Sequence, residues 1–136
     1  MTREVSRPSG SPPPAEAQFG MVRVPLVALA EETARRHLLA HPEDATRYGD
    51  LAREWAVHDM RHVLAWAFGD AGGLVELGEQ VGWLARVLDA RGYPLGNLSD
   101  CLVTAAGVVA EQVADAEGVA ARLREVAEEV RPQPRG

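Results

Sequence analysis

Hydrophobic residues recur every three or four positions along most of this chain, which is the spacing of amphipathic α-helices. No segment alternates convincingly between apolar and polar residues with period two, so we expect no sheet. The pattern predicts helices over residues 25–40, 42–48, 50–68 and 70–91, followed by a helical region from about 98 to 131. The expected fold class is therefore all-α, a four- or five-helix bundle with a long C-terminal helical region.

Residues at the expected helix ends support these limits. Pro42 disfavours helical angles at the preceding His41, and Asp50 and Asp70 are good N-caps for the helices that follow them. The Arg-Gly-Tyr-Pro segment at 91–94 places a glycine just past a helix end and a proline shortly after it.

The last helical region carries a heptad pattern. Its apolar residues recur at alternating spacings of four and three, at Leu102, Ala106, Val109, Val113, Ala116, Ala120, Leu123, Ala127 and Val130. A continuous helix over 98–131 would be about 50 Å long and would extend past the roughly 30 Å helix over 70–91. We therefore expect this seam to bind a second copy of the chain or a partner protein, through Leu102, Val109, Val113, Leu123 and Val130. The alternative is a break near 115–118, after which the chain folds back on its own bundle.

The N-terminal segment 1–20 differs in composition from the rest. Its four prolines lie among Ser, Gly and Ala, and Val5 and Phe19 are its large apolar residues. Such a segment buries too little surface to offset its ordering entropy, so we expect a disordered Pro-rich tail or a true start at Met21. A further interpretation of this segment is a docking peptide in the polyproline II conformation. The bundle domain is expected over 21–131 and a disordered end over 132–136.

An unusual polar cluster lies on the predicted helix 50–68. Trp55 and Trp66 fall within the apolar arc of the helix, with Asp59 and His62 between them and His58 at the edge. Asp59 and His62 are three residues apart and face each other, and an unpaired carboxyl at such a position would have its pKa raised by burial. Two interpretations stay open: a Trp-walled pocket for a planar ligand, or an internal Asp–His hydrogen bond that locks the helix against its neighbours.

Composition excludes several classes of protein. The 136 residues carry 14 basic residues, all Arg, against 20 acidic ones, a net charge of −6 that disfavours binding to nucleic acid or anionic membranes. No apolar run approaches the ~20 residues that span a bilayer, and the N-terminus lacks a secretory signal. The single cysteine, Cys101, fits a reducing compartment. We expect a cytoplasmic protein.

Catalytic signatures are missing from the sequence. It contains no Gly-x-Gly-x-x-Gly, no Gly-x-Ser-x-Gly and no phosphate-loop lysine, so we expect no enzyme. His37/His41 and His58/His62 have the i, i+4 spacing that can place two imidazoles on one metal ion. No pair of Glu-x-x-His motifs accompanies them, and we assign no metal ligands.

One segment resembles a known family. WLARVLDARGYP, from Trp83 to Pro94, follows a helix with His58 and a Gly69-Asp70 turn. Over residues 50–110 this order of features resembles the helical-bundle cap modules of bacterial cobalamin-binding regulators and methyltransferase-like proteins. In that family the bundle covers one face of the corrinoid, and a Rossmann-like domain supplies an Asp-x-His-x-x-Gly loop that binds cobalt. That loop is absent here, so the resemblance implies a stand-alone cap-like bundle in which His58, Trp66 and Trp83 could face the ligand.

These features combine into one leading hypothesis and two alternatives. The leading one is a non-catalytic sensor or regulatory bundle that signals through its C-terminal helix. It would bind a planar cofactor, corrinoid-like (as cobalamin) or another tetrapyrrole, in a pocket of Trp55, His58, Asp59, His62, Trp66 and Trp83. The alternatives are a protein–protein adaptor or dimerisation module without a ligand, and a His-based metal-binding bundle.

Overall fold

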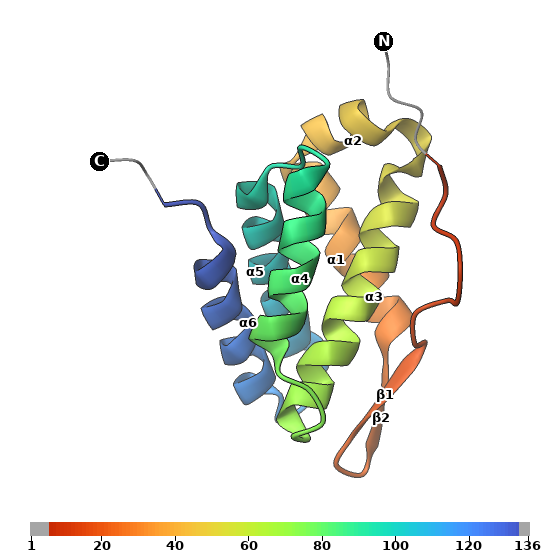
Figure 1. Cartoon of the computed structure of the whole chain (residues 1–136). Helices are drawn as coiled ribbons and strands as arrows, with labels where there is room; N and C mark the ends of the chain where they lie inside the picture. The colour runs from red at the N-terminus through yellow and green to blue at the C-terminus, as the bar shows by residue number, and fades with distance from the viewer. Residues whose placement is uncertain (1–5, 134–136) are drawn as a thin grey trace.

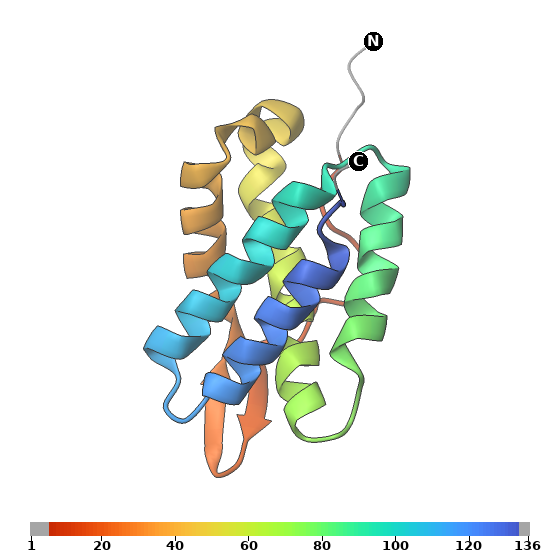
Figure 2. The same ribbon diagram turned by 90° about the vertical axis from the view of Figure 1, so that its left-hand side faces the viewer.

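The computed structural model describes residues 6–133, and most of them are helical. The long helices lie side by side as a bundle (Figures 1 and 2): α1 (Leu26–Ala40), α3 (Ala52–Ala71), α4 (Leu77–Ala90), α5 (Leu95–Gln112) and α6 (Glu117–Val130). The short α2 (Pro42–Tyr48) and a 3-10 turn, η1 (Gly49–Leu51), cross one end of the bundle between α1 and α3. The prediction of a predominantly all-α bundle is confirmed, and none of the described helices is long and apolar enough to cross a membrane.

A small antiparallel hairpin precedes the bundle and corrects two predictions. β1 (Glu16–Phe19) pairs with β2 (Val22–Pro25), with Phe19 opposite Val22, and Gly20 adopts φ +60° in the turn. The expectation of no sheet was wrong, and so was that of a disordered tail up to residue 20. Four-residue strands are too short to show a period of two, and they are held by the bundle: Phe19 packs edge-on against Phe68 at 5.3 Å between ring centroids. Residues 1–5 and 134–136 of the two expected disordered ends lie outside the described residues.

The C-terminal region is two helices, not one. It breaks over 113–116, where Asp115 has φ +60°, and α6 then folds back along α5 (Figure 2). The seam residues therefore pack inside one chain: Leu102, Val109 and Leu123 are fully buried, Val113 is buried and Val130 is partly buried against the core. The overhanging helix was a wrong prediction, and the seam does not offer the surface for a second copy or a partner.

The connection between α3 and α4 also differs from the prediction. α3 continues through Gly69 to Ala71, and α4 begins at Leu77 rather than near residue 70. The side chain of Glu76 accepts a hydrogen bond from the Glu79 amide at 2.5 Å, and Asp70 accepts one from the Leu77 amide at 2.7 Å. Two carboxylates thus satisfy amides that the first turn of α4 leaves unpaired.

Candidate functional site

Four aromatic rings form a continuous row along α3. Trp55 meets His58 edge-on at 5.5 Å between centroids, and His58 meets His62 edge-on at 5.0 Å. His62 stacks on Trp66 at 5.7 Å and 27°. The spacing of three, four and four residues places all four on one face of the helix. The structure thus brings together four of the six residues that the sequence analysis assigned to one site.

This row lies beside the core and not within it. The four side chains are half-buried, whereas the buried face of α3 carries Met60, Val63, Leu64, Ala67 and Phe68. The centre of that face is rotated by about 140° from the direction of the two tryptophans. The predicted internal pocket is therefore a surface feature, because tryptophan and histidine can place a polar edge in solvent while their rings pack on the protein.

Two of the assigned residues do not join the row. Trp83 lies on α4, is 54% exposed, and contacts no other ring within residues 6–133. Asp59 forms no hydrogen bond to any described residue, so the expected Asp59–His62 bond is not made. Burial raises the pKa of Asp59 to about 7, and the nearby positive charge of Arg91 opposes that shift.

The N-terminal segment 6–14 lies along the outer side of α3 (Figure 1). The indole N–H of Trp55 donates to the Ser6 carbonyl at 2.7 Å. The Arg61 guanidinium donates to the carbonyls of Pro13 and Pro14, at 2.5 and 3.2 Å. All three of these acceptors belong to the backbone. Trp55 and Arg61 therefore hold an extended chain through its backbone, and these three hydrogen bonds do not depend on which side chains that segment carries.

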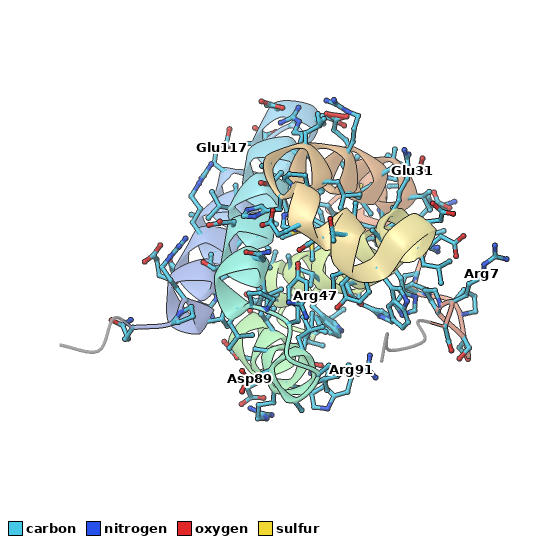
Figure 3. The ribbon with its side chains drawn as sticks, turned by 90° about the horizontal axis from the view of Figure 1, so that it is seen from above. Arg7, Glu31, Arg47, Asp89, Arg91 and Glu117 are labelled. Atoms are coloured by element: carbon cyan, nitrogen blue, oxygen red, sulfur yellow. The ribbon has the colours of Figure 1, made fainter. Side chains whose placement is uncertain are left out.

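A hollow of about 400 Å³ lies between this segment and the bundle. Trp55 and Arg61 are six residues apart, about 9 Å along the helix, while the eight residues from Ser6 to Pro13 in extended form span roughly 20 Å or more. The segment must bow outward, and Figure 3 shows Arg7 well outside the helices. The hollow is lined by Pro8, Ser9, Gly10, Ser11, Pro12 and Pro13 on one side, and by Glu31, Arg53, Glu54, Val57, His58 and Arg61 on the other.

The segment is held by few contacts. Among residues 6–14 only Pro13 is buried and Pro8 is half-buried. The ion pair between Arg7 and Glu54, at 3.7 Å, joins two largely exposed side chains and contributes little. Such an attachment is specific in position but rests on few buried groups.

Sequence analysis missed a second polar cluster, under α2. Asp44, 4% exposed, accepts hydrogen bonds from His37 Nε2 at 2.8 Å, the Tyr93 hydroxyl at 2.5 Å and Asn97 Nδ2 at 3.0 Å. Burial alone would raise the pKa of Asp44, but these three hydrogen bonds outweigh it and hold that pKa below its ordinary value. The sequence signal was available: His37 falls on the buried face of α1, where an imidazole needs a partner.

This buried cluster connects the ends of four helices. Asp44 belongs to α2, His37 to α1 and Asn97 to α5, while Tyr93 lies in the turn after α4. Arg47 donates to the Gly92 carbonyl at 3.1 Å, and its guanidinium carbon lies 6.0 Å from the centre of the Tyr93 ring. The arrangement is a structural clamp for α2.

Cys101 is buried beside this clamp, and burial raises the pKa of its thiol. A thiol that is kept neutral and covered is a poor nucleophile. It therefore adds no reactive group to either cluster.

Comparisons with known proteins add no relative: no family model, no curated protein and no solved structure matches this chain. The resemblance to cobalamin-binding cap modules therefore stays a prediction that rests on the quoted motifs.

A planar cofactor does not fit between the rings of the row. A flat ligand stacked between two rings needs about 7 Å between them, twice the contact distance of carbon atoms. The centroids within the row are 5.0–5.7 Å apart. The surface of α3 instead offers two donor side chains, Trp55 and Arg61, which already donate hydrogen bonds to backbone carbonyls of the N-terminal segment.

Proposed function

We propose that this chain is a protein-recognition module whose α3 face binds an extended polypeptide segment, with residues 6–14 as the resident occupant. Like the adaptor alternative of the sequence analysis it is a protein-binding role, but it uses the α3 surface in place of the C-terminal seam. The observation that carries it is the use of Trp55 and Arg61 to hold three backbone carbonyls of a Pro-rich segment. Proline-rich chains are common ligands of aromatic-lined grooves because they are already extended and lose little entropy on binding.

The resident segment implies regulation by competition. A tethered segment acts at an effective concentration of the order of millimolar, so a free ligand must out-compete it. Only one side chain of residues 6–14 is buried, so the segment adds little to the stability of the bundle. A partner with a longer matching sequence would displace it and occupy the hollow as well.

The test uses a chain that begins at Ala15 and a synthetic peptide of residues 6–15, SRPSGSPPPA. Trp66→Phe and Trp83→Phe leave Trp55 as the reporter of binding. The peptide should change Trp55 emission and bind the shortened chain at least about tenfold more tightly than the full chain, where the tethered segment competes. Far-UV circular dichroism checks that the shortened chain remains helical.

Arg61→Gln should remove peptide binding, since it deletes the donor to Pro13 and Pro14. Arg86→Gln, on the exposed face of α4, is the matched control and should bind as the parent does. Equal affinity of the peptide for the parent and Arg61→Gln would contradict the proposal. The competing cofactor hypothesis predicts a visible absorption band in protein purified from its native host, whereas the recognition module predicts none.

A further inference from the structure

The two histidine pairs of this chain have the same spacing but differ in what their nitrogens contact. His37 donates through Nε2 to the Asp44 carboxylate, and His41 bonds through both nitrogens, to Glu43 at 2.7 Å and Asp100 at 3.1 Å. For His58 and His62 no ring nitrogen has a hydrogen-bond partner within residues 6–133. Four nitrogen positions of this second pair are thus available, although both rings are well packed.

The separation of these two rings suits a shared metal ion. A ring nitrogen lies about 1.1 Å from its centroid and a metal ion about 2.0–2.1 Å beyond it, so two cis imidazole ligands have centroids roughly 4.5–5 Å apart. The centroids of His58 and His62 are 5.0 Å apart. The two rings therefore need only rotate, without a shift of the helix, to bring one nitrogen each onto the same ion.

The pair lies between two tryptophans in the row. Trp55 meets His58 edge-on, and Trp66 stacks on His62. His58 also lines the hollow under the N-terminal segment, which leaves room for water molecules to complete the coordination.

Among residues 6–133, Arg61 is a positive charge close to both histidines, and it opposes a cation there. Its guanidinium is directed to the carbonyls of Pro13 and Pro14 and is not between the two rings. Within the described residues no cluster of three or more His, Cys, Asp or Glu side chains is arranged to hold a metal ion, so the protein supplies two ligands and water the rest.

From this geometry we propose that His58 and His62 form a two-imidazole site for a divalent transition-metal ion, next to the peptide-binding face. Imidazole nitrogens suit copper, nickel and zinc, and among divalent ions copper binds such donors most tightly. Water-completed, tetragonal coordination is also the geometry that copper(II) prefers.

The test is a titration of the full chain with copper(II), supplied as its glycine complex, on a Trp83→Phe background. Bound copper(II) quenches nearby indoles, so Trp55 and Trp66 report on the site. We expect one ion per chain. His58→Gln or His62→Gln should weaken binding by more than about tenfold, since even loss of a group that only orients a ligand costs 10–100-fold. His41→Gln is the matched control and should bind as the parent does, because its nitrogens already have carboxylate partners.

A second measurement needs no variant. The electron paramagnetic resonance spectrum of the copper-loaded chain should show coupling to two imidazole nitrogens. Unchanged affinity in both His58→Gln and His62→Gln, or a spectrum without two imidazole nitrogens, would overturn the proposal. Neither result bears on peptide binding, which is measured without metal.

Discussion

The clamp under α2 makes a quantitative prediction about Asp44→Ala. This change removes the acceptor of three hydrogen bonds and leaves the buried His37 imidazole, 2% exposed, and the half-buried Tyr93 hydroxyl without it. A buried polar group that loses its partner costs about 1–3 kcal/mol and a half-buried one costs less, so the change should cost about 2–4 kcal/mol. Domains of this kind have a total stability of about 5–15 kcal/mol, so a large part of it would be lost.

Urea unfolding followed by far-UV circular dichroism measures the free energy of unfolding of Asp44→Ala and of the control Glu43→Ala. Glu43 is the neighbouring carboxylate on α2, and its side chain is largely exposed, so its loss should cost less than about 1 kcal/mol. Because the pKa of Asp44 is lowered in the fold, its contribution is present above the ordinary aspartate range and is lost as pH falls through the folded pKa. Asp44→Ala should therefore flatten the acid side of the stability profile. If the two variants were equally stable, Asp44 would not be the clamp described above.

Three further predictions concern other parts of the bundle. Asp59→Asn should become progressively more stable relative to the parent as pH rises from about 4 to 7, since the pKa of Asp59 is raised to about 7 in the fold and its ionisation opposes folding. Urea titrations at several pH values, with EDTA present, measure this difference, and they would show no such trend if Asp59 were solvated. Leu123→Ala should lower the free energy of unfolding by about 2–5 kcal/mol, whereas Leu74→Ala, at a side chain 83% exposed, should change it by less than about 0.5 kcal/mol. Comparable losses for the two variants in urea unfolding would contradict the internal packing of the seam. Because the seam closes within one chain, sedimentation should give the mass of a monomer, and a dimer that Leu123→Ala dissociates would refute the closure.

The aromatic row on α3 was predictable from the sequence, but its position relative to the core was not. The spacing of Trp55, His58, His62 and Trp66 on one helix face follows from helical geometry alone. Their position beside the core does not, because Ala, Met and Val elsewhere on α3 can form an apolar face equally well. The packing of α1, α4, α6, α2 and the hairpin on α3 decides which face is covered.

The N-terminal segment shows the same limit. Its composition correctly indicated that it buries little, and most of residues 6–14 are exposed. That it is nevertheless held along α3 depends on two side chains, Trp55 and Arg61, some fifty residues away in sequence. Contacts between residues so far apart in sequence produce no local sequence pattern from which they could be predicted.

The sequence by itself determined most of the helical segments, because periodicity, prolines and glycines act over a few residues. It did not show the start of α4 at Leu77 or the break between α5 and α6. It placed the ends of α1 and α2 and the stop after α4 at their observed positions. The tertiary structure decided what the apolar faces contact. The heptad seam is the clearest case: its spacing is the same whether one long helix meets a partner or two helices fold together. The turn over 113–116, with Asp115 at positive φ, lets α6 bury those residues against α5 and the rest of the same chain.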